Sequence, residues 1–400
     1  MITLHGVQER LKYYRSCFDH DLLELSLPWT SGKGADTGDH LRAAMQWLCR
    51  AQDAFDDGGV ARSYALVYKP YFRKKGWIAS YPETTGYIIP TVFDYARATG
   101  DQRLFDRAVR MADWECDIQL ASGAVQGGTI DQPPSPAIFN TGQVIFGWLR
   151  TYQETLKEKY LGAAVRAADF LLAHQDADGA WRRHLSAFTN PDMAFYTYNT
   201  RTAWALLLLS TVLEDSSYRT AALRNIEFAL TQQRGNGWFH SNCLSDPSQP
   251  LVHTIAYCIR GILEAGVLVK DERFIASAQK AADALLVNQR ADGSLAGRYN
   301  ARWQPAVSWS CLTGNAQMAI IWGRLYQLTG QMRYLVALNQ ATQYLKSVQI
   351  LKTNNPNLYG GITGARPING PYGSYEILNW AVKFFIDALL LEHALRGAAP

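Results

Sequence analysis

The sequence predicts an all-α protein, an (α/α)6 toroid built from six helical hairpins. Three observations predict this fold. A glutamine followed by a turn recurs every 56 to 67 residues, a threonine at the start of a second helix recurs every 54 to 59 residues, and strand-like alternation is scarce outside the connecting loops. One hairpin cannot bury its apolar faces alone, but stacked neighbours can. A last helix, expected over 374–396, is available to pack against the first at 39–53, which favours a closed ring.

Length and composition agree with one large core. The chain has 400 residues, of which 48% are hydrophobic and 18% charged. Length alone would suggest two or three domains, but a closed repeat can use the whole chain in one. We therefore expect a single toroid domain over residues 1–400. Within it, residues 1–38 are expected to form lead-in helices followed by a Gly- and Ser-rich loop that ends in a helix cap.

The first helix of each expected unit ends at a repeated glutamine. These glutamines are Gln52, Gln119, Gln175, Gln233, Gln289 and Gln349. Four of them are followed four residues later by a glycine, and the other two have glycines nearby. Glycine commonly ends a helix because it adopts the left-handed conformation without a Cβ clash. The pattern therefore predicts a helix-closing turn in every unit.

The second helix of each unit follows an irregular segment rich in Tyr, Trp, Asn and Pro. Its start is marked in five units by a threonine, namely Thr85, Thr141, Thr200, Thr254 and Thr313. We expect Thr and Asn at these starts to cap the exposed N–H groups of the first helical turn. The bodies of these helices, such as 144–152 and 205–213, are apolar on nearly every side, which is typical of helices enclosed by others.

Charge and targeting signals exclude several classes of function. The net charge is only +4 and the basic residues are scattered, which argues against a nucleic-acid-binding groove. Apolar runs such as 203–209 are too short to span a bilayer, so no membrane insertion is expected. The first residues lack a basic segment followed by an apolar one, so we recognise no signal peptide and expect a cytoplasmic location. The oligomeric state is left open.

No metal or cofactor is expected. The six cysteines lack CxxC spacing and are expected to be reduced thiols. His174 and His184 flank a turn without an HxH or HExxH pattern, and neither a Walker A nor a Rossmann fingerprint is present.

The starts of the more apolar helices should converge on one end of the ring and form a cleft there. Aromatic rings stack on the apolar faces of sugars, and amide, carboxylate and guanidinium groups bind sugar hydroxyls and carboxylates. For any single residue, packing within a loop is the plain alternative. The expected saccharide-binding residues are Tyr81, Glu83, Tyr87, Asn140, Gln143, Tyr196, Tyr198, Arg201, Tyr257, Trp303, Trp309, Asn315, Gln317, Tyr372, Tyr375 and Glu376.

A lyase acting on uronates is the leading hypothesis. β-Elimination needs groups that neutralise the C6 carboxylate, a base for the C5 proton and an acid for the leaving O4. Three consecutive repeat loops offer these groups: Asn199, His253, Arg298, Tyr299 and Arg302. The alternatives are a capping or packed role for the histidine and a solvated-loop role for the arginines.

A glycoside hydrolase is the second hypothesis. Such an enzyme needs two carboxylates flanking the scissile bond. Glu83 is the candidate acid, and Asp131, Asp192 or Glu376 is its candidate partner, but each of these carboxylates is isolated in the sequence. Glu83 could equally be a first-turn charge that the helix dipole stabilises. A third hypothesis is a non-catalytic glycan-binding protein of an exopolysaccharide system.

Several segments carry a resemblance to known families. The repeat resembles the six-hairpin (α/α)-toroid superfamily of glycosidases, sugar epimerases, polysaccharide lyases and terpene cyclases. The turn 175–181 is similar to the QW turn of triterpene cyclases, whose acidic DxDD motif is absent here, so a cyclase is disfavoured. Segments 80–91 and 309–317 are similar to bacterial exopolysaccharide-locus proteins.

The set of Asn, His, Arg and Tyr resembles polysaccharide lyase family 38. This resemblance implies that Asn199 and His253 neutralise the carboxylate and that Arg298 or Arg302 binds the acid. It also implies that Tyr299 is the base and acid, a role that Tyr196, Tyr198 or Tyr257 could take instead. The substrate implied is a uronate-containing oligo- or polysaccharide.

Overall fold

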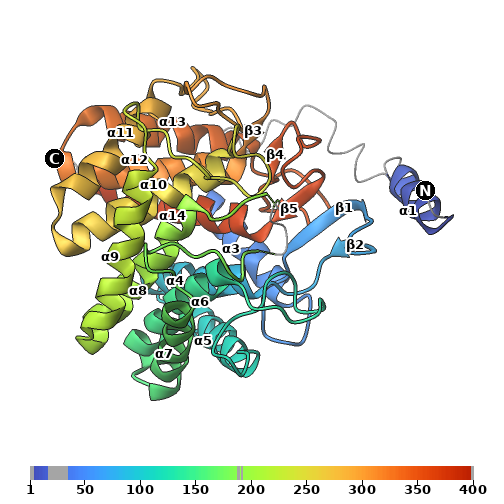
Figure 1. Cartoon of the computed structure of the whole chain (residues 1–400). Coiled ribbons are helices and arrows are strands. Elements are labelled where there is room, and N and C mark those ends of the chain that lie inside the picture. Colours follow the sequence, from blue (N-terminus) through green and yellow to red (C-terminus); the bar gives the residue numbers. More distant parts are fainter. Residues whose placement is uncertain (1–3, 17–34, 187–189, 191, 398–400) are drawn as a thin grey trace.

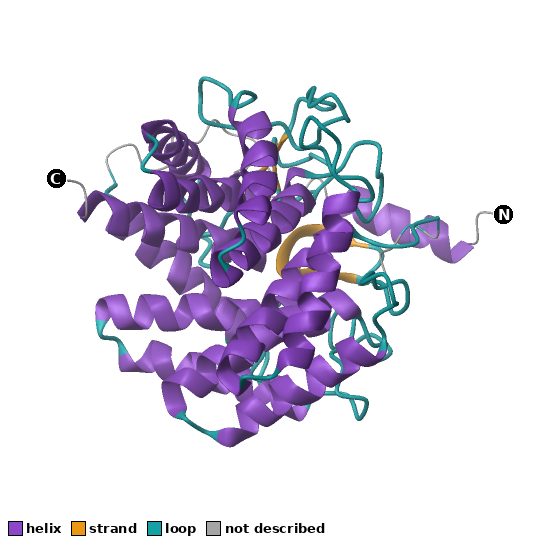
Figure 2. Cartoon of the chain, turned by 60° about the vertical axis from the view of Figure 1, so that its left-hand side comes forward, coloured by secondary structure: helices purple, strands orange, loops and turns teal. Residues whose placement is uncertain are grey.

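The protein is a closed double ring of helices with its loops gathered at one end (Figures 1 and 2). The computed structural model describes residues 4–16, 35–186, 190 and 192–397. The inner ring consists of α4 (Pro82–Thr99), α6 (Ile138–Thr155), α8 (Thr200–Leu213), α10 (Val252–Val269), α12 (Leu312–Thr329) and α14 (Asn379–Gly397). Each inner helix packs on the next, and α14 packs on α4. The predicted (α/α)6 toroid is confirmed.

The outer ring covers the apolar flanks of the inner helices. It consists of α3 (Thr37–Gln52), α5 (Gln102–Asp117), α7 (Glu158–Ala173), α9 (Ser216–Thr231), α11 (Glu272–Leu286) and α13 (Met332–Val348). Inner and outer helices are joined by short turns at one end of the barrel, and long loops return the chain at the other. Ahead of the ring lies α1 (Leu4–Ser16), one of the expected lead-in helices, and residues 17–34 lie outside the described part.

The repeated glutamines fasten each unit to the next. Nε2 of Gln175 donates to the carbonyl oxygen of Gly179 in its own turn (3.1 Å) and to that of Ala221 in the next outer helix (2.8 Å). The other five glutamines make the same pair of bonds. For Gln349 the next outer helix is the first one, because its Nε2 donates to the carbonyl oxygen of His40 at 3.0 Å. The ring is therefore closed by the same contact that joins its other units.

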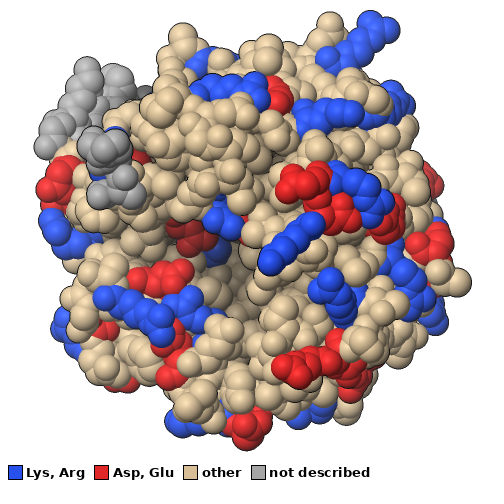
Figure 3. Space-filling view, turned by 90° about the vertical axis from the view of Figure 1, so that its left-hand side faces the viewer, with Lys and Arg blue, Asp and Glu red and all other residues tan. Residues whose placement is uncertain are grey.

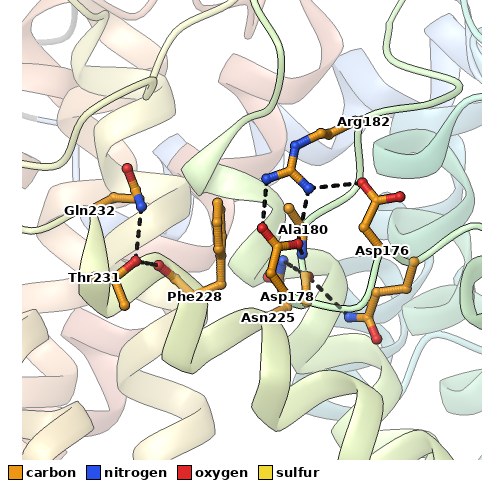
Figure 4. A network of polar contacts seen from close by, with 10 residues as sticks. Asp176, Asp178, Ala180, Arg182, Asn225, Phe228, Thr231 and Gln232 are labelled. Atoms are coloured by element: carbon orange, nitrogen blue, oxygen red, sulfur yellow. Dashed lines mark hydrogen bonds and ion pairs between the residues drawn. The ribbon is translucent and has the colours of Figure 1, made fainter.

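The turn after α7 shows why a glycine follows each glutamine. Gly179 has a φ of +92°, and a Cβ on it would lie 2.4 Å from the carbonyl oxygen of Arg224 in α9. Its own carbonyl accepts a hydrogen bond from Nδ2 of Asn225. Figure 4 shows Arg182 bound to Asp176 and Asp178, which closes the turn over this contact. Only a residue without a side chain allows the turn to approach the next helix so closely.

Short strands form where the long loops meet. β1 (Ser63–Lys69) pairs antiparallel with both β2 (Lys74–Trp77) and β5 (Glu376–Leu378), and β3 (Ser310–Cys311) pairs with β4 (Ala365–Arg366). The strand β5 overturns the expectation that the last helix begins at residue 374. Residues 376–378 pair with 63–65, so the helix begins at Asn379. The sheet thereby links the loops of the first and last units.

Two of the regularly spaced threonines, Thr85 and Thr141, have a role other than helix capping. The N-cap residues of α4 and α6 make no side-chain capping bond. Instead, Oγ1 of Thr85 accepts from the backbone N–H of Val60, and Oγ1 of Thr141 accepts from that of Val125, both at 2.9 Å. These hydroxyls therefore bind the preceding loop to the helix start. The expectation of capping is wrong at these two positions.

The inner helix α10 has the length and hydropathy of a membrane span, with a mean hydropathy of 1.4 over 18 residues. However, 72% of this window is buried in the barrel, where α10 packs between α8 and α12. A helix that is apolar all round is expected when neighbours surround it. The packing of the ring thus explains its composition, and the absence of membrane insertion stays a prediction.

Candidate functional site

A pocket of about 200 Å³, here named the entrance pocket, opens at the end of the barrel where the inner helices begin. In Figure 1 this is the right-hand end, which also carries β1, β2 and β5. Eight of its lining residues are among the predicted site residues: Tyr81, Glu83, Tyr87, Asn140, Tyr198, His253, Tyr257 and Tyr372. The remaining lining residues are Arg62, Thr84, Phe139, Ser186, Leu244, Leu251, Thr254 and Trp380.

Glu83 is the only carboxylate among the described lining residues of this pocket. It lies in the first turn of α4, where Pro82 begins the helix, and Oε2 accepts a hydrogen bond from the Tyr81 hydroxyl at 2.9 Å. Burial raises the pKa of Glu83 to about 7, although Tyr81, Arg201 and Arg62 favour its ionised form. A carboxyl group that titrates near neutral pH can both donate and accept a proton.

His253 faces Glu83's pocket from the first turn of α10. Its Nδ1 lies 2.8 Å from Oε1 of Gln317. Burial lowers the pKa of His253 to about 4, and the positive charge of Arg201 adds to this effect against the bond to Gln317. At neutral pH the ring is therefore uncharged. If Nδ1 donates to Gln317, Nε2 is an acceptor.

Arg62 supplies positive charge to the pocket wall. Its Nη1 lies 2.5 Å from Oε2 of Glu376, and Nζ of Lys69 lies 2.9 Å from Oε1 of the same carboxylate. Burial opposes ionisation of Glu376, but Arg62 and Lys69 outweigh it and lower its pKa to about 2. This trio carries two positive charges against one negative charge, so one positive charge remains beside the pocket.

Aromatic side chains form most of the remaining wall. The Tyr372 hydroxyl accepts a hydrogen bond from Nε1 of Trp380 at 2.7 Å. The rings of Tyr257 and Tyr372 lie 4.4 and 5.4 Å from that of His253, centroid to centroid. Tyr198 packs edge-on against Phe139. The arrangement offers apolar ring faces beside one carboxyl, one imidazole and one guanidinium group.

Four predicted residues, Arg201, Gln143, Gln317 and Asn199, do not line this pocket. Nε of Arg201 donates to Oε1 of Gln143 at 2.6 Å, and both side chains are buried. Gln317 supports His253 from below and, like Arg201, lines a second cavity. Asn199 is buried beside α8 and does not line the entrance pocket.

In the segment expected to supply the lyase arginines and tyrosine, Tyr299 and Arg298 make hydrogen bonds to the loops. The hydroxyl of Tyr299, which is fully buried, accepts a hydrogen bond from the backbone N–H of Ala296. Arg298 donates to the carbonyl oxygen of Gln249 and to Oγ of Ser245, holding the preceding loop. Arg302 is exposed. The structure does not bring these three residues to the pocket, which corrects the expectation that they converge with His253.

Further predicted residues support the loops. Nε1 of Trp303 donates to the carbonyl oxygen of Asn236, and Trp309 belongs to a small apolar cluster that includes Leu251. Oδ1 of Asn315 accepts from the backbone N–H of Leu295, and Nδ2 donates to Ser310 and Cys311. None of the three predicted residues lines the pocket.

The other aromatic and acidic candidates also lie outside the lining. Tyr196 stacks on Tyr198 with ring centroids 4.8 Å apart. Tyr375 joins the loops through its backbone, accepting from the N–H of Leu66. Asp131 and Asp192 are exposed.

Arg62 and Trp380 were missed because they precede β1 and follow β5, two strands that sequence periodicity did not reveal. The apolar run over 64–68 was the available signal, since a short run of this kind is typical of a buried strand. The strand that pairs with it, residues 376–378, is too short to recognise from the sequence. The described residues include no group of three His, Cys, Asp or Glu that could hold a metal ion.

Comparisons with known proteins support the architecture. A family model for the squalene-hopene cyclase C-terminal domain matches residues 135–265, less than half of the chain. No curated protein matches the sequence. An unsaturated glucuronyl hydrolase specific for heparin is similar in structure, with a TM-score of 0.71 at 16% identity over 90% of this chain and 98% of that chain.

Two further solved structures share this arrangement. The unsaturated glucuronyl hydrolase from Bacillus sp. GL1 gives a TM-score of 0.69 at 14% identity over 90% of this chain and 97% of that chain. Cellobiose 2-epimerase from Bacillus thermoamylovorans B4167 gives 0.72 at 13% identity over 90% and 98%. At such identities the likeness establishes the fold. The chain therefore has the (α/α)6 toroid fold that these enzymes share.

Proposed function

We propose that the protein is a carbohydrate-active enzyme that binds a carboxylate-bearing saccharide in the entrance pocket and transfers a proton through Glu83. The aromatic walls favour stacking on sugar rings, and Arg62 provides a charge for a uronate carboxylate. The toroid enzymes with similar structures include glucuronyl hydrolases and an epimerase, which supports a saccharide substrate.

The observation that carries this proposal is the state of Glu83. It is the one carboxylate among the described lining residues, and burial brings its pKa to about 7. A purely structural first-turn carboxylate would be more stable in the ionised form beside the helix dipole. Proton transfer is most efficient when the pKa of the acid or base lies near the working pH.

β-Elimination is the reaction that we propose first. Arg62 and the amide of Asn140 would hold the C6 carboxylate, and Glu83 would take the C5 proton. The electron pair of the C5–H bond would form the C4–C5 double bond as the C4–O4 bond breaks. A tyrosine hydroxyl, from Tyr257 or Tyr372, would protonate O4. This reaction needs one proton-transferring carboxylate in the pocket, which is what the described lining contains.

Glycoside hydrolysis is the second candidate. A protonated Glu83 could serve as the general acid, and the glucuronyl hydrolases among the structural neighbours favour this reaction. A mechanism with two flanking carboxylates needs a partner. Glu376 is held by Arg62 and Lys69, and Asp131 and Asp192 are exposed away from the lining. Hydrolysis therefore lacks a second carboxylate among the described lining residues of the pocket.

The test is to incubate the protein with a panel of uronate polymers and to follow two products. Elimination creates a double bond conjugated with the carboxylate, which absorbs in the ultraviolet, whereas hydrolysis creates reducing ends without this absorbance. Glu83→Gln should lower turnover by about 10²- to 10⁴-fold, the usual contribution of general acid–base catalysis. Asp131→Asn, which alters an exposed carboxylate, is the matched control.

Each outcome selects one hypothesis. Ultraviolet absorbance that is lost in Glu83→Gln and kept in Asp131→Asn supports elimination through Glu83. Reducing ends alone overturn elimination in favour of hydrolysis. Saturable glycan binding without either product supports the non-catalytic glycan-binding protein. Turnover that survives Glu83→Gln unchanged removes Glu83 from the chemistry.

A further inference from the structure

A second cavity lies inside the barrel beneath the entrance pocket. Its volume is about 60 Å³, and it lies among the inner helices α8, α10, α12 and α14. It is lined by Arg201, Trp204, Arg260, Gln317, Ile320, Lys383, Phe384 and Asp387. Figure 3 faces the end of the barrel where the inner helices finish and shows a central hollow with basic and acidic side chains around it.

The lining of this cavity has an excess of positive charge. It contains three cationic side chains, Arg201, Arg260 and Lys383, and one carboxylate, Asp387. Asp387 is paired with Lys383, and its Oδ1 also accepts from the hydroxyl of Thr91 at 2.6 Å. Within the lining, the two arginines therefore lack a counter-charge.

Arg260 shares a carboxylate with another arginine outside the cavity. Its Nε lies 2.7 Å from Oε1 of Glu264, and Nε of Arg324 lies 2.9 Å from the same oxygen. Burial raises the pKa of Glu264, but both arginines outweigh this effect and lower it. One carboxylate therefore serves two guanidinium groups.

Arg201 is the most isolated of the three cations. Its side chain is buried, and within the described part of the chain no carboxylate lies at ion-pair distance from it. Within the described part of the chain, its Nε donates to Oε1 of Gln143. The rings of Tyr257 and Trp204 lie 5.1 and 5.5 Å from its guanidinium carbon. Aromatic faces stabilise a cation only in part, and a buried charge normally has a full partner.

The excess of positive charge lowers the pKa of the neighbouring cationic groups. Burial lowers the pKa of Lys383 to about 8, and Arg201 and Arg260 lower it further against the attraction of Asp387. Burial also lowers the pKa of Arg201, with Arg260 adding to the effect. A negative charge in the cavity would relieve both repulsions.

The size of the cavity limits what can enter it. One water molecule needs about 10 to 15 Å³ of cavity volume. A cavity of about 60 Å³ therefore accommodates a small ion with little water and excludes a sugar residue. Guanidinium groups bind oxyanions through paired N–H donors, and an ammonium group binds them as a point charge. Gln317 adds amide hydrogens if its Oε1 accepts from His253.

We propose that this cavity binds a small inorganic anion, no larger than phosphate, between Arg201, Arg260 and Lys383. The anion completes the core of the barrel by pairing with charges that the chain leaves in excess. The site is separate from the entrance pocket, although Gln317 and Arg201 connect the two. The proposal holds whether or not the protein has the function proposed above.

The test measures sulfate binding to the full-length protein without saccharide. Urea unfolding is followed in increasing sodium sulfate, with sodium gluconate at equal ionic strength as the reference, because gluconate is too large for the cavity. We expect saturable stabilisation by sulfate beyond that by gluconate. A charge-assisted hydrogen bond contributes enough to expect an affinity loss of about tenfold or more in Arg260→Gln.

Arg324→Gln is the matched control, because it also leaves Glu264 with one arginine but does not touch the cavity. We expect it to bind sulfate as the unsubstituted protein does. Equal stabilisation by sulfate and gluconate in the unsubstituted protein would overturn the proposal. So would equal sulfate affinities of the two variants.

A crystallographic measurement serves if Arg260→Gln does not fold. Crystals of the unsubstituted protein grown in sodium bromide should show anomalous scattering from bromide between Arg201 and Lys383. Bromide found on the surface with none in the cavity would contradict the proposal. Both experiments are performed without turnover, so their failure is distinguishable from failure of the proposed enzyme activity.

Discussion

Glu83→Gln should change how stability depends on pH in a manner that can be worked out in advance. Burial raises the pKa of Glu83 from 4.5 to about 7, so the folded protein prefers the protonated carboxyl. The associated stability is fully present below about pH 4.5 and is lost as the pH rises through about 7. At 1.36 kcal/mol for each tenfold change, the loss amounts to roughly 3 kcal/mol. Glutamine has the shape of the protonated acid and does not titrate.

The assay is urea unfolding followed by circular dichroism, with both proteins measured at a series of pH values. Other groups titrate equally in the two proteins, so the difference between their unfolding free energies isolates Glu83. We expect Glu83→Gln to gain roughly 3 kcal/mol relative to the unsubstituted protein between about pH 4 and about pH 8. Asp131→Asn, which removes an exposed carboxylate, should show a much smaller change. A difference for Glu83→Gln that is constant with pH would refute the inference that burial raises the pKa of Glu83 to about 7.

Three further predictions concern the parts of the fold that hold the site. Tyr299→Phe should lower the unfolding free energy by about 1 to 2 kcal/mol, because a buried N–H loses its acceptor, and should leave kcat/KM unchanged; lost turnover at unchanged stability would instead support its catalytic role. Gln175→Ala should cost about 1 to 3 kcal/mol in chemical denaturation, since two carbonyl groups lose a donor, and a neutral result would show that the repeated glutamine is dispensable. Gly293→Ala should cost about 2 kcal/mol or more, because its Cβ would lie 2.1 Å from a backbone oxygen of α13. Gly330→Ala, also at positive φ but in open space, should cost less, and equal losses would contradict the close-approach explanation.

The sequence predicted the fold well because the contacts between units repeat. Each unit needs the same glutamine to reach the next outer helix and the same close turn beneath it, so the requirement appears as a period in the chain. Gln349 reaches His40 just as Gln175 reaches Ala221. A regular spacing therefore carried information on the closure of the ring as well as on its units.

The site was harder to predict because its residues do not repeat. Tyr81, Glu83 and His253 could be placed at the mouth of the barrel because each lies at a helix start. Tyr299 and Arg298 have side chains suited to the same chemistry and lie in a comparable loop of their own unit. Their hydrogen bonds, however, hold the loops together. The path of an irregular loop decides between these outcomes, and no periodic signal records it.

Loop pairing also determined which residues were missed. Arg62 reaches the pocket because residues 63–65 pair with 376–378, more than three hundred positions away. That pairing places Glu376 beside Arg62 and fixes the sign of the charge at the pocket wall. A contact of this kind involves two short segments, and neither is distinctive by itself.

The bond from Gln349 to the carbonyl of His40 has a consequence for biosynthesis. In an open array of repeats, each unit can pack on the one made before it. Here the side of α3 that faces the last unit has no partner until Gln349, 309 residues after His40, has been made. Chains emerge from the ribosome at about 5 to 20 residues per second. The first helix of the ring to be made, α3, is thus among the last to be fully covered, and the nascent chain exposes the unpaired faces of its first and last units until the ring closes. The closed ring has no exposed terminal unit, but it can form only after residue 349 has been synthesised.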